Sequence, residues 1–277
     1  MSERIQKVLS RVGTGSRRQI EDWIRQGKIQ VNKKTARIGD HISPDDRVYI
    51  DGKKIDLSGS SEVERRVIAY YKNEGEICSR NDPEHPDSVF DHLPRLTSGR
   101  WISVGRLDLN TCGLLIFTTD GELANRLMHP SYKIEREYAS RVLGDVPAGA
   151  LENMLSGVEC EDGVLKFDSI RDAGGEGANH WYHVILHQGR YREVRRLWES
   201  QGIKVSRLKR VRYGPVTLPR SLRQGKWMEL DHAQINHLLS MTGMKTETGK
   251  KTAGRSSAIR KKRYSPRKRK SGARPKG

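Results

Sequence analysis

Arg106 and Asp108 stand two residues apart in the segment of this chain best suited to acid–base or nucleophilic chemistry. Gly105 and Gly113 bracket the segment, which predicts a loop that presents Asp108 from a rigid support. An ionised carboxylate in such a loop can attack an electrophilic carbon or accept a proton. From spacing alone, an ion pair between Arg106 and Asp108, or an aspartate that stabilises a turn, is the more frequent arrangement.

The residues around Asp108 predict the elements that hold it. A strand should end near Val104, and residues 114–117 form a continuous apolar run, which is typical of a strand buried on both faces. Thr119 and Glu122 have the spacing of a capping box. They predict a helix that runs to about Met128 and stops at the following His-Pro pair.

Further strands and helices alternate irregularly after residue 66. Strands are predicted at residues 67–71, 138–142, 181–186 and 207–213, and a helix ended by Gly202 carries Val194, Leu197 and Trp198 on one face. This order is not a regular repeat of strand, helix and strand. It predicts an α+β domain rather than a doubly wound α/β domain.

The first 55 residues predict a separate small module of two helices and short strands. Ile5, Val8, Leu9 and Val12 recur at helical spacing, and Ser16 with Gln19 forms a capping box that opens a second helix. Strands should follow at residues 29–31 and 47–50. The polar stretch 56–64 has the composition of a linker, so we place a domain boundary there.

Two arginines open the second helix of this module, where the helix dipole disfavours cations. Arg17 and Arg18 could therefore hold a phosphate together with the helix-end amides, and Lys28, Lys33 and Lys34 could widen that anion site. A pair of solvated surface arginines is the simpler alternative. A later strand that carries Arg207, Lys209, Arg210 and Arg212 likewise fits either a phosphate track near a cleft or a solvated face.

The charge of the chain predicts a polyanionic partner. The 277 residues carry a net charge of +18, and the segment from Lys245 onward holds fourteen Lys or Arg against Glu247 alone, a net +13 that leaves +5 for the rest. Clustered cations gain affinity for nucleic acids by releasing condensed counterions. A membrane surface is the competing partner, but only Ile259 and Tyr264 could insert near the basic cluster, so we expect no membrane association.

The sequence contains no evident binding motif for a metal or a nucleotide cofactor. The cysteines Cys78, Cys112 and Cys160 show no CxxC pairing, and no Walker A or Rossmann glycine pattern is present. Three dispersed cysteines favour a reducing compartment. No apolar run approaches a membrane span or a secretion signal, so we expect a soluble cytoplasmic protein.

Residues 4–54 resemble the S4 RNA-binding domain. The likeness rests on segments 7–9, 15–18 and 27–32, read as Lys-Val-Leu, Gly-Ser-Arg-Arg and Gly-Lys-Ile-Gln-Val-Asn. It covers about a fifth of the chain. It implies that the N-terminal module binds RNA.

The segment Arg106-Leu107-Asp108, followed by Gly113-Leu114-Leu115, closely resembles the catalytic motif of the RsuA and RluB class of pseudouridine synthases. The likeness extends in order through residues 70–75, 136–138 and 189–197. It implies that Asp108 is the catalytic aspartate of an enzyme that isomerises uridine in RNA without metal or cofactor. One departure is Tyr191, where Asn is expected in close relatives.

The resemblance also assigns partners to Asp108. It implies that Arg195 keeps the carboxylate charged and oriented, and that Tyr138 stacks on a target base turned out of the RNA. Without it, Arg195 would be a surface arginine of a basic helix and Tyr138 a core residue. The cations expected to contact RNA are Arg17, Arg18, Lys28, Lys72, Arg106, Arg136, Arg190, Arg192, Arg196 and Arg210.

The predicted whole is an S4 domain at residues 1–60, a synthase domain with a mixed, largely antiparallel sheet at 66–243, and a basic disordered tail at 244–277. The resemblance implies a monomeric enzyme that modifies 23S ribosomal RNA or a large-subunit precursor, at a uridine of the position-2605 type. Alternatives are a sister synthase acting on 16S ribosomal RNA or a neighbouring 23S uridine, a non-catalytic ribosome-assembly factor that binds RNA, and a DNA-binding regulator.

Overall fold

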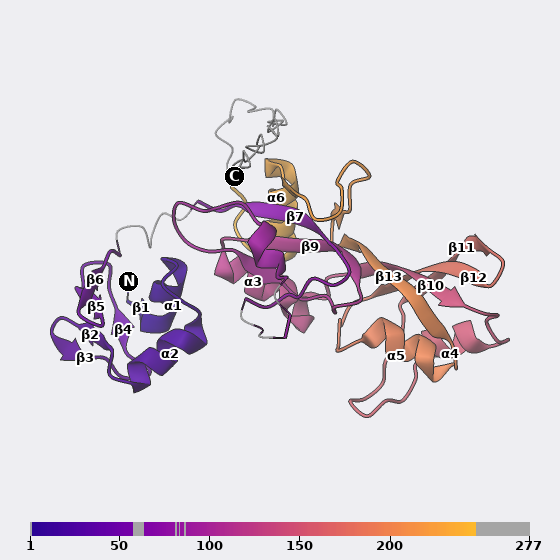
Figure 1. Ribbon diagram of the computed structural model, residues 1–277, viewed down its shortest axis with the longest axis horizontal. Helices are drawn as coiled ribbons and strands as arrows, with labels where there is room; N and C mark the ends of the chain where they lie inside the picture. The colour runs from indigo at the N-terminus through magenta and orange to yellow at the C-terminus, as the bar shows by residue number, and fades with distance from the viewer. Residues whose placement is uncertain (1, 58–63, 81, 83, 86, 248–277) are drawn as a thin grey trace, which may run out of the picture. The chain divides into compact units, whose positions relative to one another are not determined.

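The N-terminal module contains two helices and two small sheets (Figure 1). The computed structural model describes residues 2–57, 64–80, 82, 84–85 and 87–247. One sheet pairs β1 with β4, and the other has the order β3-β2-β5-β6. The elements are β1 (Glu3–Arg4), α1 (Ile5–Arg11), α2 (Arg17–Arg25), β2 (Ile29–Val31), β3 (Lys34–Thr35), β4 (His41–Ile42), β5 (Val48–Ile50) and β6 (Lys53–Ile55).

The predicted capping box opens α2. The backbone N–H of Gln19 donates to the Ser16 hydroxyl at 3.1 Å, and the Gln19 side chain accepts from the N–H of Ser16 at 3.5 Å. Both helices place apolar residues, among them Leu9 and Ile20, in one core with Ile29. The sequence prediction of this module is therefore confirmed in its helices and in its central strands.

A large sheet with one parallel pairing forms the second part of the chain (Figure 1). Its strand order is β11-β12-β10-β13-β9-β7-β15, with β14 on β13 and β8 on β9; β9 and β13 are parallel, and the other pairs are antiparallel. The strands are β7 (Val67–Lys72), β8 (Ile102–Val104), β9 (Cys112–Thr118), β10 (Arg136–Leu143), β11 (Ser169–Glu176), β12 (Asn179–Leu186), β13 (Lys204–Tyr213), β14 (Val216–Thr217) and β15 (Trp227–Glu229). The predicted α+β class and the mixed, largely antiparallel sheet are confirmed.

Alternating residues of the central strands build two cores. In β9, Leu114 and Ile116 pack with α3 (Gly121–Met128) and α6 (His232–Met241), whereas Leu115 and Phe117 pack in the core shared by α4 (Ala150–Ser156) and α5 (Glu193–Ser200). Figure 1 shows α4 and α5 beneath the strands β10, β12 and β13. All residues of β9 are buried, as the apolar run predicted. The strand that follows the Asp108 loop is thus held from both sides.

The structure corrects the start of α3 and adds elements that the sequence did not predict. Asp120, not Thr119, caps α3, because its carboxylate accepts the N–H groups of Glu122 and Leu123 at 2.8 and 3.1 Å. The predicted end at Met128 is confirmed. The strand β11 and the helices α4 and α6 had not been predicted.

Two expectations fall on residues outside the described part of the chain. The linker at 56–64 is described only at its ends, and the basic tail is described only to residue 247. The domain limits therefore remain predictions. Among the described residues, none of the helices has both the length and the apolar character that a membrane crossing requires.

Candidate active site

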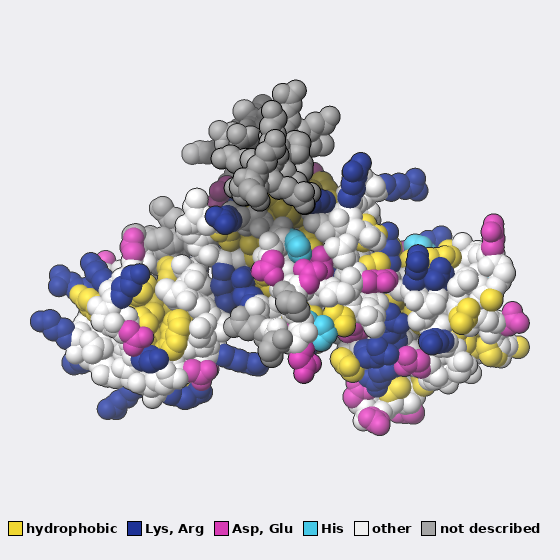
Figure 2. All heavy atoms as spheres, viewed as in Figure 1, with side chains coloured by type: hydrophobic (Ala, Val, Ile, Leu, Met, Phe, Trp, Pro, Cys, Tyr) yellow, Lys and Arg dark blue, Asp and Glu magenta, His cyan; other side chains and the backbone are white. Residues whose placement is uncertain are grey.

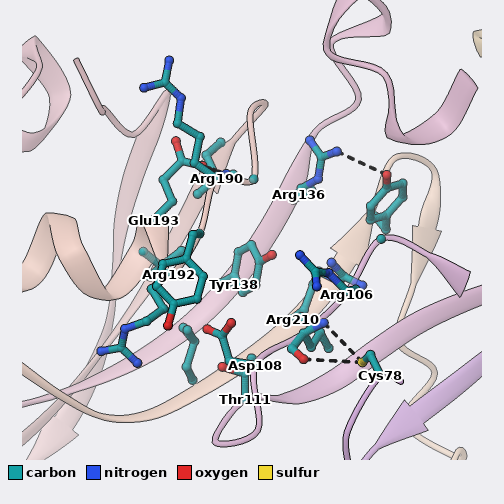
Figure 3. Close-up of a pocket in the computed structure, with 18 of the residues that line it drawn as sticks. Cys78, Arg106, Asp108, Thr111, Arg136, Tyr138, Arg190, Arg192, Glu193 and Arg210 are labelled. Atoms are coloured by element: carbon teal, nitrogen blue, oxygen red, sulfur yellow. Dashed lines mark hydrogen bonds between the residues drawn. The ribbon is translucent and has the colours of Figure 1, made fainter. Parts of the chain in front are cut away.

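A cavity of about 470 Å³ opens in the sheet domain beside the Asp108 loop (Figure 3). Most of its lining comes from the loop between β8 and β9, strand β10, strand β13 and the turn that opens α5, and residues 77–79, Met128 and Leu186 complete it. Asp108 and Tyr138 are directed into this space, with Arg106 beside them. Of the predicted site residues, those that line the cavity are Arg106, Asp108, Arg136, Tyr138, Arg190, Arg192 and Arg210.

The carboxylate of Asp108 is free to act on a bound molecule. The turn is closed by its backbone carbonyl, which accepts the N–H of Thr111 at 3.0 Å. No hydrogen bond or ion pair joins the Asp108 side chain to another residue in the described part of the chain, and Arg106 is exposed without an acidic partner there. Neither structural alternative for this pair, an ion pair or a side-chain turn, is what the fold contains.

Lys72 supports the Asp108 loop from inside the protein. Its side chain is fully buried, and Nζ donates to the carbonyl oxygens of Asn73, Asp108 and Thr111 at 2.8, 3.1 and 2.9 Å, with Leu109 at 3.3 Å. Burial lowers the pKa of this amine. The expected contact between Lys72 and an RNA phosphate is therefore wrong for this structure, because the ammonium is buried and bonded to backbone carbonyl groups.

Arg195 also reaches the loop through its backbone. It lies in α5 with 8% of its surface exposed, and its guanidinium donates to the carbonyl oxygens of Asn110 at 2.7 Å and Val205 at 2.9 Å. No ion pair within 4.0 Å joins Arg195 to Asp108 among the described residues, and burial lowers the pKa of the guanidinium, an effect that the charge of Asp108 opposes. Arg195 is therefore not a solvated surface arginine, and it contacts the loop two residues beyond the carboxylate.

Tyr138 lies both in the core and in the wall of the cavity. It belongs to the core that contains Leu107 and Val194, and it also lines the cavity with 8% of its surface exposed. Its ring faces the space above Asp108 (Figure 3). A rigidly packed ring at this position offers one flat surface to a base.

Two arginines that line the cavity both pack against the ring of Tyr213. Arg136 and Arg210 each place the guanidinium carbon 5.1 Å from the ring centre of Tyr213, and Arg136 donates to the carbonyl of Ile134 at 3.0 Å and to that of His187. Arg210 donates to the carbonyl of Leu114 at 2.8 Å, while its Nη2 has no partner in the described part of the protein. Both predicted RNA contacts are thus largely buried wall residues.

The arginines that open α5 are paired with acids or carbonyl groups. Arg196 forms an ion pair with Asp162, Arg192 lies 3.0 Å from Glu199, and Arg190 donates to the backbone carbonyl of Asp162 at 2.5 Å. Arg190 and Arg192 line the cavity and Arg196 lines an adjoining hollow, while their contact with RNA stays a prediction. Their charge is locally balanced.

Most of the cations in β13 do not line the cavity, and further cations are exposed on the N-terminal module. Of Arg207, Lys209, Arg210 and Arg212, only Arg210 lines the cavity, and Arg212 pairs with Glu135 and Glu137 at 2.8 and 2.9 Å. A phosphate track along the whole strand near the cavity is therefore not what the fold provides. In the N-terminal module, Lys and Arg side chains project from several sides (Figure 2). Exposed cations there include Arg17, Arg18 and Lys28.

Sequence reasoning missed two side chains that shape the site. The Cys78 sulfur lies 3.4 Å from both the N and the O of Leu107, the residue between Arg106 and Asp108. Glu193 is buried and accepts the N–H of Arg190 at 2.8 Å, so it fixes the turn before α5. Nothing in the sequence indicates the contact between Cys78 and Leu107, because the two residues are far apart along the chain. The position of Glu193 in the first turn of a predicted helix could have indicated its contact with the turn.

One group of side chains away from the cavity has the composition of a metal site. His92 lies 2.9 Å from Asp87 and 3.7 Å from Glu76. Glu76, however, already accepts from the Tyr70 hydroxyl at 2.8 Å and from Asn73. Hydrogen bonding within the protein accounts for this buried carboxylate.

Comparison with known proteins identifies both parts of the chain. Residues 66–200 match the RNA pseudouridylate synthase family, and residues 3–48 match the S4 domain. A protein of Escherichia coli O6:H1 called ribosomal large subunit pseudouridine synthase B is 56% identical over 255 residues, which cover 91% of this chain and 88% of the relative. Proteins of the same name from Vibrio cholerae and Pseudomonas aeruginosa are 55% and 53% identical, over 89% and 95% of this chain and 77% and 69% of their own lengths.

A solved structure agrees with the fold. The crystal structure of a pseudouridylate synthase superposes with a TM-score of 0.59 at 24% identity, over 85% of this chain and 99% of the other. At that identity the match supports the fold alone. The identity to the curated relatives over most of the chain, with the two family matches, shows that this protein belongs to the family of pseudouridine synthases that carry an N-terminal S4 domain.

Proposed function

We propose that this enzyme converts a specific uridine of large-subunit ribosomal RNA to pseudouridine, with Asp108 as the catalytic residue. The observation that carries the proposal is the unpaired carboxylate of Asp108 in a cavity shared with Tyr138. A protein that only binds RNA would gain nothing from an unpaired carboxylate that faces this polyanion. The relatives that are more than half identical to this chain are named for the same reaction on the large subunit.

The isomerisation of uridine requires a carboxylate and an enclosing wall, and this cavity contains both. The bond from C1′ to N1 breaks, the uracil turns, C5 joins C1′, the proton on C5 leaves, and the freed N1 takes up a proton. No atom is gained or lost overall, and no electron passes to another molecule. The step therefore needs a carboxylate near the sugar and walls that retain the detached base. Asp108 supplies the first, by attack on C1′ or by removing a proton from C2′.

Tyr138 and Arg195 complete the proposed machinery in different ways. Tyr138 stacks on the uracil after the target nucleotide has been turned out of the RNA. Arg195 and Lys72 hold the backbone of the Asp108 loop through the carbonyl groups of Asn110 and Asp108. In this assignment Arg195 acts on Asp108 through position and long-range charge, with no direct ion pair.

The cations around the cavity and in the S4 domain bind the RNA backbone. Arg106 is exposed at the cavity without an acidic partner in the described chain, and Arg17 with Arg18 lies in the first turn of α2. Helix-end amides and paired guanidinium groups together suit a phosphate. We assign the S4 domain to residues 1–60, the synthase domain to 66–243, and an RNA-binding arm to the basic tail.

The target that we propose is a 23S uridine of the position-2605 type, modified by a monomer in the cytoplasm. The names of the relatives support the large subunit as substrate. The alternatives are a neighbouring 23S uridine or a uridine of 16S ribosomal RNA. A ribosome-assembly factor without activity is disfavoured because the unpaired aspartate is retained.

Mapping pseudouridine in ribosomal RNA tests the proposal. Cells that lack the protein should lose one large-subunit pseudouridine, and wild-type protein should restore it, whereas Asp108→Asn should not. An Arg207→Gln variant, changed at an exposed cation outside the cavity, serves as the control and should restore the site. An unchanged large-subunit map would overturn the proposed substrate, and restoration by Asp108→Asn would overturn the assigned catalytic residue.

A further inference from the structure

Tyr191 is an aromatic side chain held in solvent at the edge of the active-site cavity. It is 76% exposed, the largest value among the exposed large apolar residues of the described chain. It lines the cavity and also borders an open adjoining hollow of about 590 Å³. The other residues that line this hollow are Cys160, Glu161, Asp162, Arg196 and Glu199. Tyr191 therefore stands between the space that receives the target base and a second space beside it.

The backbone at Tyr191 is held in place by hydrogen bonds, whereas its side chain makes none within the described chain. Arg196 donates to the Tyr191 carbonyl at 3.3 Å, and Arg192, the N-cap of α5, has a φ of 47° that sharply turns the chain. On the other side, the N–H of Arg190 donates to the buried Glu193. The Tyr191 hydroxyl has no hydrogen bond within the described chain. Because the backbone at Tyr191 is already ordered, a ligand that stacks on the ring has to order the side chain alone.

The charges of the hollow select the part of a nucleotide that fits. The cation of its lining, Arg196, is already paired with Asp162, and Glu199 is paired with Arg192, so Glu161 is left as the lining acid without an ion pair among the described residues. A phosphate would find no unpaired cation among the residues that line this hollow. A base would meet an aromatic face and carboxylate oxygens, which accept hydrogen bonds from ring N–H or exocyclic amino groups.

We infer that the hollow beside Tyr191 is a subsite for the base of an unpaired nucleotide that flanks the target uridine. The base stacks on the Tyr191 ring, and an edge that carries an amino group faces Glu161. Stacking on an exposed aromatic residue is the common means by which proteins hold single-stranded RNA. This inference rests on the proposed function and adds a determinant of which uridine is chosen.

A coupled substitution in protein and RNA tests the stacking contact. The substrate is a stem-loop of the large-subunit RNA around the uridine found by mapping, made with an abasic residue at each neighbouring position in turn. The proteins are the wild type, Tyr191→Phe, Tyr191→Leu and, as a matched exposed aromatic outside both spaces, Trp227→Leu. The measurement is kcat/KM for pseudouridine formation.

Loss of stacking should lower kcat/KM roughly 5- to 100-fold for Tyr191→Leu, while Tyr191→Phe and Trp227→Leu should stay within about threefold of the wild type. An abasic residue at one neighbouring position should lower the wild-type value by a similar factor and should not lower that of Tyr191→Leu further. Independent effects at every position, or no effect of Tyr191→Leu, would overturn the subsite. If the wild type forms no pseudouridine, the proposed function fails, and the same coupling in RNA-binding affinity still decides the subsite.

A second comparison tests the carboxylate side of the hollow. At the position that couples to Tyr191, uracil should be a poorer neighbour than a base that carries an amino group. Glu161→Gln should reduce that preference, because an amide both donates and accepts. A preference unchanged in Glu161→Gln would overturn the assignment of this edge contact.

Discussion

The Nζ atom of Lys72 lies 3.1 Å from the backbone carbonyl oxygen of Asp108. Lys72 is buried at the end of β7, and Asp108 follows β8, so the contact joins two segments of the sheet domain that are distant in sequence. A single ammonium gathers four carbonyl groups of this region, most of them in the loop. The position of the free carboxylate therefore depends on a cation that the substrate does not touch.

Replacing Lys72 should damage both stability and activity. Lys72→Met leaves buried carbonyl groups without donors, which costs about 1–3 kcal/mol, and the loop should lose its fixed geometry. We expect a lower free energy of unfolding in urea and a fall in kcat larger than the change in KM. Lys204→Met, at an exposed lysine of β13, should match the wild type in both measurements. Normal kcat in a folded Lys72→Met protein would contradict the positioning role.

Gly113 should tolerate no side chain. Its φ is 110°, and an added Cβ would lie 2.3 Å from the carbonyl oxygen of Arg210, where β9 and β13 run in parallel. Gly113→Ala should therefore destabilise the protein by at least about 3 kcal/mol. Gly121→Ala is the matched control, since its Cβ would only touch Ile102 at 3.4 Å at the start of α3. Thermal unfolding that is equal in both variants would show that this close crossing is wrong.

Most helices and strands that were predicted correctly have local signals in the sequence. The capping box of Ser16 and Gln19 and the apolar run of β9 each lie within the element that they predict. The roles of Lys72 and Arg195 could not be predicted in the same way. Both are cations whose partners are carbonyl groups of the remote Asp108 loop, and a carbonyl has no signature in a sequence.

Burial of Glu193 should make stability depend on pH. Desolvation raises the pKa of this carboxyl in the folded protein above its usual value of 4.5. The folded state then holds the proton more tightly than the unfolded state, and this contribution to stability is present at low pH and lost as the pH rises through the raised pKa. Comparison with Glu193→Gln isolates it.

The difference in unfolding free energy between wild type and Glu193→Gln should change across that pH interval in favour of the wild type at the acid end. Chemical denaturation at a series of pH values above 4 measures the difference. A constant difference would contradict a raised pKa for Glu193.

The basic tail should contribute salt-dependent affinity for RNA. Removal of residues 245–277 takes away a net charge of +13, and with fewer cations bound to phosphates the affinity should depend less steeply on salt. Binding of a large-subunit RNA fragment by wild type and truncated protein, measured over a range of KCl concentrations, tests this. An unchanged slope would show that the tail does not bind phosphates.

The most direct test of the central claim is release of tritium from RNA labelled at C5 of uridine by purified protein. The wild type should release the C5 label of one uridine per large-subunit RNA. Asp108→Asn should bind the RNA with similar affinity and release none, because the carboxylate that acts at the sugar is gone. Label release by Asp108→Asn at the wild-type rate would contradict the assignment of Asp108 as the catalytic residue.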